Sequence, residues 1–316
     1  MTQPVHTDPA LRHDMLLLFD ITDGNPNGDP DADNQPRQDL ETNQGLATDG
    51  SVKRKIRDTI ALAAQAAGLD LSRYRIFIEA GESLNPRLEE SYTANGFDLE
   101  TAEDAEDSDT AAAKSKSRKG ARKVLPAGDA ETALAWLHNR YFDLRMFGGV
   151  LGTGNTPSLG KTRGPLQVGF ARSISPITPE QHTITRVAKA RQTEARHGEI
   201  GNKWTIPYGL YAVRLHYSAS RGEKTGVSSD DLRLLYDTLI MMWDHTSSAA
   251  RADMATQGLF VFTHPNAFGA APADALLRLV TITPRDEQRP PRSFTDYEVV
   301  VDHAKVPEAV TLTRLV

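Results

Sequence analysis

The sequence predicts an α+β protein, in which a strand–helix–strand unit near each end of the chain builds one βαββαβ-type sandwich with large insertions. Three observations support this fold class. Short apolar runs are bounded by turn residues, long segments carry apolar residues at helical spacing, and no segment repeats another. With 316 residues, 39% of them hydrophobic, the chain is long enough for about two domains or one large domain.

The first strand–helix–strand unit is predicted over 15–80. An apolar run at 15–22 indicates a buried strand, and a loop rich in Gly, Pro, Asn and Asp follows at 23–50. Apolar residues then recur every three or four positions over 51–68, which predicts a helix ending at a glycine. Residues 73–80 are predicted to form the next strand. So long a loop in a compact domain is more often functional than not.

The second half of the chain contains the remaining predicted elements. Asp129 is placed to cap a helix that runs to about Phe147. The alternation of apolar and polar residues predicts strands at 165–177, at 208–220, at 258–262 and at 276–282, a two-stranded hairpin at 182–206, and an amphipathic helix at 228–245.

Composition excludes several classes of protein. The chain has no cysteine, which excludes a disulfide scaffold, a cysteine-ligated metal site and a thiol nucleophile. No stretch approaches the roughly 20 apolar residues that cross a bilayer, and the N-terminus lacks the apolar segment of a signal peptide. We therefore expect a cytoplasmic protein without a membrane partner.

Charge is distributed unevenly along the chain. The net charge is −6, which by itself argues mildly against a nucleic-acid binder. However, residues 98–109 hold seven acids and no base, and residues 114–123 hold six bases and no acid. This stretch is interpreted either as a solvated surface loop without chemistry or as an insertion whose basic half helps to hold a polyanion.

The sequence offers weak metal and nucleotide motifs. Asp29, Asp31 and Asp33 are spaced like the start of a calcium loop, but Asn34 and Leu40 stand where that loop needs Gly and Glu. Asx turns in a proline-rich loop explain the same residues. The GKT at 160–162 lacks the spacing and the following helix of a phosphate-binding loop.

No arrangement for catalysis is evident. The nine histidines show no metal-ligand spacing, and no GxSxG elbow is present. Nothing combines a nucleophile with a base and an orienting acid. The sequence therefore predicts no catalytic residue, no metal and no cofactor.

Cations gather where the long loop meets the predicted helix at 51–68. Lys53, Arg54 and Arg57 share one flank of this helix, and Arg37 lies in the preceding loop. Free N–H groups at a helix start together with these cations suit a phosphate backbone. The alternative is an ordinary solvated face.

Two further segments are candidates for close contact with a ligand. Residues 145–154 carry four glycines after a helix, which indicates either a C-terminal cap and bend or a backbone that approaches a ligand. The predicted hairpin at 182–206 interleaves cations with apolar residues, as in a ribbon that inserts between bases and holds phosphates. The alternative is an edge hairpin protected by charge. Its cations are Arg186, Lys189, Arg191, Arg196 and Lys203.

With these segments in view, the chain resembles the CRISPR-associated backbone subunit of Cascade-type surveillance complexes, of the RAMP superfamily and of type I-C in particular. The resemblance covers nearly the whole chain except the charged insertion. The segments that carry it are FDITDGNPNGDPDADNQPRQDLETNQGLATDGSVKRKIRD (19–58), RMFGGVLGTG (145–154), GPLQVGFARSISPI (164–177), PYGLYAV (207–213) and SSAARADMATQGLFVF (247–262).

The resemblance implies a hand-like fold with a modified RNA-recognition, ferredoxin-like palm. It implies a palm at 1–80, 126–181 and 207–316, inserted helical fingers at 81–125 and a β-hairpin thumb at 182–206. Copies of such a subunit polymerise along the crRNA, thumbs kink the RNA of the neighbouring copy, and the exposed bases pair with target DNA. The other implied partners are the repeat-processing end-cap subunit, the large subunit and the small subunit.

Contacts to phosphate and sugar rather than to base edges would let such a subunit hold any guide sequence. The expected RNA-binding residues are Asn25, Asn27, Arg37, Lys53, Arg54, Arg57, Gly148, Gly149, Gly152, Arg186, Lys189, Arg191 and Lys203. The candidate base wedges are Ile184, Val187 and Trp204. Two other functions stay open: a metal-dependent repeat-associated endoribonuclease that uses a carboxylate of the 23–50 loop, and a calcium-regulated interaction protein.

Overall fold

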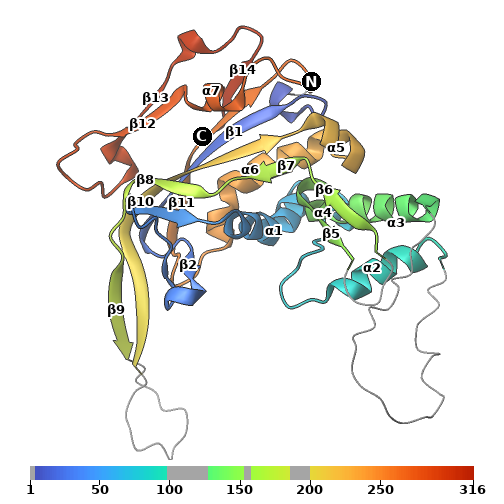
Figure 1. The fold of residues 1–316 in the computed structure, drawn as a ribbon, viewed down its shortest axis with the longest axis horizontal. Helices are drawn as coiled ribbons and strands as arrows, with labels where there is room; N and C mark the ends of the chain where they lie inside the picture. Colours follow the sequence, from blue (N-terminus) through green and yellow to red (C-terminus); the bar gives the residue numbers. More distant parts are fainter. Residues whose placement is uncertain (1–3, 98–126, 153–157, 186–199) are drawn as a thin grey trace, which may run out of the picture.

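The computed structural model describes residues 4–97, 127–152, 158–185 and 200–316. Its centre is a mainly antiparallel sheet with the strand order β14–β11–β1–β10–β8–β4, in which β7 and β9 also pair with β10 (Figure 1). These strands are β1 (His13–Gly24), β4 (Gln44–Ala47), β7 (Leu166–Val168), β8 (Ala171–Pro176), β9 (Glu180–Thr185), β10 (Ile200–Tyr217), β11 (Asp253–Thr263) and β14 (Thr311–Arg314).

Helices and three small sheets surround this centre. The helices are α1 (Asp49–Ala66), α2 (Leu84–Thr93), α3 (Ala127–Arg140), α4 (Phe142–Phe147), α5 (Ala219–Thr225), α6 (Ser229–His245) and α7 (Ala273–Leu277). The small sheets pair β2 (Gly28–Asp29) with β3 (Gln35–Pro36), β5 (Gly148–Leu151) with β6 (Gly160–Arg163), and β12 (Val280–Pro284) with β13 (Tyr297–Val301).

Helices α1 and α6 cover one face of the sheet. Their apolar stripes include Ile56, Ile60 and Leu235, which are fully buried against β1 residues such as Leu17 and Phe19. Both helices begin at a side-chain cap, Thr48 for α1 and a Ser228–Asp231 capping box for α6. The hydrophobic core on this face is larger than the core on the opposite face.

The C-terminal part of the chain covers part of the opposite face. Leu16, Leu18 and Phe262 point to this side and pack with α7, β12 and β13. In Figure 1, α7, β12 and β13 lie above β8, and the β9–β10 hairpin extends below it. The cover therefore leaves a strip of this face open beside β8, where Phe170 is 57% exposed.

A separate small core lies in the lobe formed by α2, α3, α4 and β5. Phe77, Tyr92 and Tyr141 are buried in it. The lobe is joined to the sheet layer by a fully buried ion pair, in which Arg145 of α4 donates two hydrogen bonds, of 3.0 and 2.8 Å, to the carboxylate of Asp231 in α6. The fork geometry of this pair fixes the lobe against α6.

Most predicted elements are confirmed, with changed boundaries. The predicted strands at 15–22 and 258–262 correspond to β1 and β11, and the predicted helices at 51–68 and 228–245 correspond to α1 and α6. The hairpin at 182–206 forms, but its second strand continues without a break through the predicted strand at 208–220 as β10.

The predicted strand at 73–80 is wrong. Its backbone is irregular because the N–H groups of Phe77 and Ile78 bind the buried carboxylate of Asp143 instead of a neighbouring strand. Three other predictions need correction. The helix at 129–147 breaks between α3 and α4, the strand at 165–177 is divided into β7 and β8, and the first part of 276–282 belongs to α7.

The 23–50 loop is also more ordered than predicted, since it contains β2, β3 and β4. The charged insertion at 98–109 and 114–123 lies outside the described residues. Within the described ranges, no helix has both the length and the apolar composition needed to cross a membrane.

Two buried histidines predict an acid-sensitive fold. Burial lowers the pKa of His13 and of His138 to about 4, and the positive charge of Arg145 adds to this effect at His138. Both side chains ionise near pH 6.5 when exposed, so their stabilising contribution is complete above that pH and is lost as the pH falls toward 4. We expect each to lower the free energy of unfolding by about 2 kcal/mol at pH 5.

Urea unfolding at pH 7.5 and at pH 5 measures this effect. His138→Leu removes one titrating group and should remove about half of the histidine-dependent loss. An unfolding free energy that is the same at pH 7.5 and at pH 5 would contradict the assignment.

Candidate nucleic-acid interface

The loop before α1 is held by its own asparagines. The Asn27 side-chain oxygen accepts a hydrogen bond of 2.9 Å from the backbone N–H of Thr48, the residue that caps α1. Asn25 is buried; its amide donates to the Asn34 carbonyl at 2.7 Å, and its backbone N–H donates to the Ala250 carbonyl at 2.7 Å. Asn25 and Asn27, which were predicted to contact RNA, therefore stabilise the conformation of the loop through hydrogen bonds within the protein.

Three of the predicted cations lie at the surface of this region, each beside one carboxylate. The pairs are Lys53 with Asp49 at 2.8 Å, Arg54 with Asp58 at 2.7 Å and Arg37 with Asp29 at 3.3 Å. Pairs of this kind are worth about 0–1 kcal/mol each. A phosphate can therefore replace the carboxylate at little cost in free energy.

Arg57 differs from these three cations. Its guanidinium is largely buried and donates at 2.9 Å to Asp143, whose carboxylate also accepts from the backbone N–H groups of Phe77 and Ile78. The structure does bring Arg57 and Lys53 together, since both lie over the Phe147 ring, at 5.2 and 5.8 Å. The ion pair explains Arg57 as a structural residue, because a bound phosphate would have to displace a buried carboxylate.

Two cations that the sequence analysis did not assign to the interface, Lys55 and Arg251, lie beside this surface. Burial and the charge of Arg251 lower the pKa of Lys55, and Arg54 adds to the effect. Among the described residues, the Lys55 amine donates a hydrogen bond only to the Thr246 carbonyl, at 3.5 Å. In the described part of the chain, the Arg251 guanidinium has no ion pair, and its buried Nε has no hydrogen-bond partner. Two neighbouring cations without a carboxylate partner favour an anionic ligand.

The glycines after α4 are explained by packing within the protein. Gly148 ends α4 with a φ of 73°, and a Cβ there would lie 2.3 Å from the Thr162 carbonyl oxygen in β6. A Cβ on Gly152 would lie 2.3 Å from the Ser158 hydroxyl. The predicted close approach to RNA stays a prediction for these residues and for Gly149. Gly148 directly follows Phe147, the residue whose ring contacts Lys53 and Arg57.

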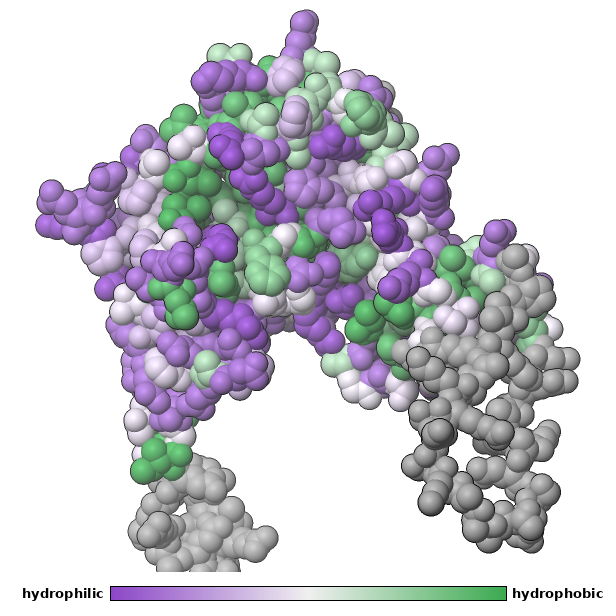
Figure 2. Space-filling model, viewed as in Figure 1, coloured by the Kyte–Doolittle hydropathy of each residue, from purple (hydrophilic) through white to green (hydrophobic). Residues whose placement is uncertain are grey.

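The β9–β10 hairpin projects away from the sheet (Figure 1). Near its outer end Ile184 is 53% and Ile200 73% exposed, and an apolar patch there interrupts the hydrophilic surface (Figure 2). Closer to the sheet, the backbone of Lys203 lies opposite that of His182 in the strand register. Trp204 is half-buried, and its indole N–H has no hydrogen-bond partner among the described residues. Four predicted contacts, Arg186, Val187, Lys189 and Arg191, lie outside the described residues, as does Arg196.

The hairpin and the α2–α3–α4 lobe extend on two sides of the α1 region and enclose a recess on the lower side of the molecule (Figures 1 and 2). The β2–β3 loop lies between them. The predicted cation cluster, the glycine segment and the hairpin are therefore arranged around one open surface.

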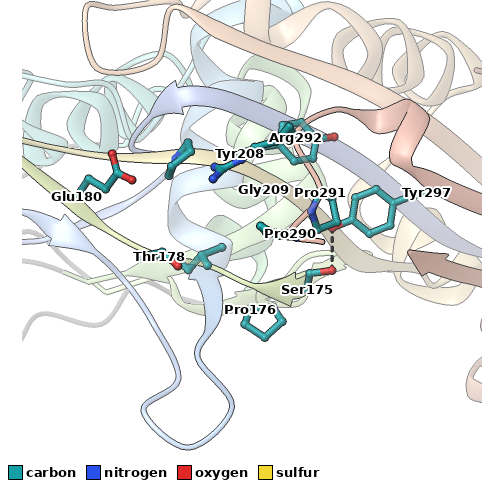
Figure 3. A pocket seen from close by; sticks show the side chains of 12 residues that line it. Ser175, Pro176, Thr178, Glu180, Tyr208, Gly209, Pro290, Pro291, Arg292 and Tyr297 are labelled. Carbon is teal, nitrogen blue, oxygen red and sulfur yellow. Dashed lines mark hydrogen bonds between the residues drawn. The ribbon is translucent and has the colours of Figure 1, made fainter. Parts of the chain in front are cut away.

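A small pocket of about 120 Å³ lies where the hairpin meets the C-terminal segment (Figure 3). Its walls are mostly Pro176, Pro207, Pro290, Pro291, Tyr208 and Tyr297. Two of its hydroxyl groups are engaged within the protein, since Tyr297 donates to the Ser175 hydroxyl at 2.9 Å and Tyr208 donates to Asp20 at 3.0 Å. Thr178, Glu180 and Arg292 also line it.

The carboxylates of the 23–50 loop do not converge. Asp29 accepts from the backbone N–H of Asp31 and pairs with Arg37, and Asp33 ends a short 3-10 helix in a left-handed conformation. Within the residues that the structure describes, no three His, Asp or Glu side chains lie close enough to hold a metal ion. The geometry gives no positive support to a calcium site or a metal-dependent ribonuclease at this loop.

Comparison with known proteins decides the family. The family model for "CRISPR-associated protein Cas7" matches residues 11–302. The chain belongs to the Cas7 family. A Cas7 protein of Haloferax volcanii is 47% identical over 49 residues, a stretch that spans 16% of this chain and 14% of that protein.

Solved structures similar to this Cas7 chain come from CRISPR complexes. A chain of a "CRISPR RNA-guided surveillance complex, pre-nicking" has a TM-score of 0.45 and 16% identity, with 79% of this chain and 75% of that chain covered. A chain of the "Type III-B Cmr-beta bound to cognate target RNA" has a TM-score of 0.38 and 10% identity, with 79% and 61% covered. The family assignment rests on the match over 11–302.

Proposed function

We propose that this Cas7 protein is a non-catalytic, crRNA-binding backbone subunit of a type I-C Cascade complex. The proposal rests on the recess between the hairpin and the lobe, on the cations Lys53 and Arg54 of α1, and on Arg251, which has no ion pair among the described residues. Family membership supports the same conclusion. In this role, copies of the chain polymerise along the guide and leave its bases free to pair with target DNA.

The binding surface that we propose consists of Arg37, Lys53, Arg54, Lys55 and Arg251. It combines side chains from the 23–50 loop, α1 and the segment between α6 and β11. These cations would contact the phosphates and not the base edges, so the surface suits any guide sequence. Asn25 and Asn27 contribute indirectly because they hold the loop in place.

We assign the parts of the proposed hand to the observed elements. The central sheet with α1, α3, α4 and α6 belongs to the palm (1–80, 126–181 and 207–316), the fingers (81–125) include α2, and the β9–β10 hairpin is the thumb. The exposed Ile184, with Val187 and Trp204, is the candidate wedge between bases of the RNA held by a neighbouring copy. Other Cascade subunits cap this assembly, and its location is the cytoplasm.

Shortening the thumb tests this function. Thr185 and Ile200 are paired across the two strands, so replacing 186–199 by Asn-Gly closes the hairpin with a two-residue turn. We expect this variant to fold and to bind a short RNA, but to form no regular assembly on a long RNA. Electron microscopy and gel filtration with RNA measure the result. Assemblies identical to those of the unmodified chain would contradict the thumb assignment.

A further inference from the structure

The open strip of the sheet face opposite α1 carries an exposed aromatic ring. Ala171 in β8 is buried in the core under α1 and α6, so Arg172, the next residue of the strand, points to the other face. Phe170 lies in the short connection between β7 and β8, directly before Ala171, and is 57% exposed. On β10, Val213 and Leu215 belong to the same core, so Arg214 points to the other face as well. Phe170, Arg172, Arg214 and His216 therefore line one strip, which we call the arginine strip.

Main-chain pairing places these side chains next to one another. Arg172 lies opposite Ala212, and the backbone N–H of Gly169 donates to the Arg214 carbonyl at 2.9 Å. Phe170 therefore lies two residues before Arg172, and its neighbour Gly169 is hydrogen-bonded to Arg214 on β10. His216 follows two residues further along β10, on the same face.

The charges of the strip are held by exchangeable partners. Arg172 forms an ion pair with Asp39 at 2.8 Å, and Arg214 forms one with Asp274 at 2.7 Å. Arg172, Arg214 and Asp274 are about half exposed, and Asp39 is partly exposed. Arg278 shares Asp274 with Arg214, so the three arginines meet only two carboxylates. A phosphate can enter this network without leaving a buried charge unpaired.

We propose that the arginine strip binds single-stranded nucleic acid, with one base stacked on Phe170 and the adjoining phosphates held by Arg172 and Arg214. Aromatic side chains and guanidinium planes are the groups on which unpaired bases stack. The proposal adds a contact surface to the proposed function and rests on it. Arg172 is paired with Asp39 of the loop that also carries Arg37, so the strip continues the candidate interface around the edge of the sheet.

The chemistry of the strip favours nucleic acid over a docked protein. The side chains of the strip are one exposed aromatic ring and cations at the surface. A protein interface of useful affinity instead has an apolar centre that excludes water. One exposed ring between two cations matches the stacking and phosphate contacts of a flexible strand.

Phe170→Ala tests the proposal, with Phe268→Ala as the matched control. Phe268 is 92% exposed and lies in the segment after β11, at the end of β1 remote from the hairpin. Affinity is measured for guide RNA on the free chain, and then for complementary and for non-complementary DNA strands on the guide-loaded assembly. The three arms identify the source of the strand.

We expect Phe170→Ala to weaken binding about 5- to 100-fold in at least one arm, as loss of one stacked base requires. Phe170→Trp should retain the affinity, Phe170→Leu should not, and Phe268→Ala should leave all arms unchanged. A photoreactive uracil in the bound strand should cross-link to the peptide that contains Phe170.

Equal affinities for Phe170→Ala and the unmodified chain in all three arms would overturn the proposal. So would a loss of association between protein copies with unchanged affinity for every strand, because that result identifies a protein-docking surface. The proposed function fails separately, if the unmodified chain binds no guide RNA at low salt. Binding of DNA by the free chain that depends on Phe170 would then still support the strip.

Discussion

Arg145→Ala is expected to lower the free energy of unfolding by about 3–5 kcal/mol. The guanidinium is fully buried, binds both oxygens of Asp231 and donates at 2.6 Å to the His138 carbonyl. Its removal leaves Asp231, which is also buried, with only the partly exposed Arg73 as a cationic partner, at 3.2 Å. The lobe also loses its main polar connection to α6.

Urea unfolding measures this loss, and Arg233→Ala is the control. Arg233 lies on α6 and forms an exposed ion pair with Asp230, so its removal should change stability little. Arg145→Lys should recover only part of the loss, because an ammonium cannot bind both carboxylate oxygens in the same fork geometry. Equal stability of the Arg145→Ala and Arg233→Ala variants would show that the buried pair does not hold the lobe.

The combined variant Lys53→Ala, Arg54→Ala and Arg251→Ala is expected to weaken RNA binding for all sequences alike. Each lost phosphate contact lowers the slope of log affinity against log salt by about 0.7, so the slope should fall by about 2. Arg57 is left unchanged, because its removal would leave the buried Asp143 carboxylate without its ion-pair partner and destabilise the fold.

The control for this variant removes the same charge elsewhere. Arg285, Arg289 and Lys305 lie in the C-terminal segment, where each forms a surface ion pair and Arg285 also donates to the Thr295 carbonyl. Replacing these three by alanine should leave the salt slope unchanged. If both triple variants reduced the slope equally, only net charge would matter, and the interface would be assigned wrongly.

The sequence predicted those elements that repeat an apolar pattern over many residues. The helices α1 and α6 and the strands β1 and β11 follow from local periodicity and caps, because each buries one face against the same layer. The 73–80 segment has a strand-like pattern, yet the decisive partner of its N–H groups is Asp143, more than sixty residues away. No local pattern carries that information.

The same limit applies to the candidate interface. A cluster of cations at the start of α1 could be found in the sequence, but not the fact that Arg57 is bound by a buried acid. Arg251 stands alone in the sequence, and only the fold brings it near Lys55. Phe170 could be located in a predicted strand, but its exposure depends on where the C-terminal segment stops covering the sheet.

We expect this chain to bind an RNA strand through its phosphates, without base-specific contacts. Titration of the full chain with two unrelated RNA sequences of equal length, and with a shorter RNA, across a series of salt concentrations tests it most directly. We predict equal affinities and equal salt slopes for the two sequences, and weaker binding of the shorter RNA. A strong preference for one sequence, or an affinity that salt leaves unchanged, would contradict the account.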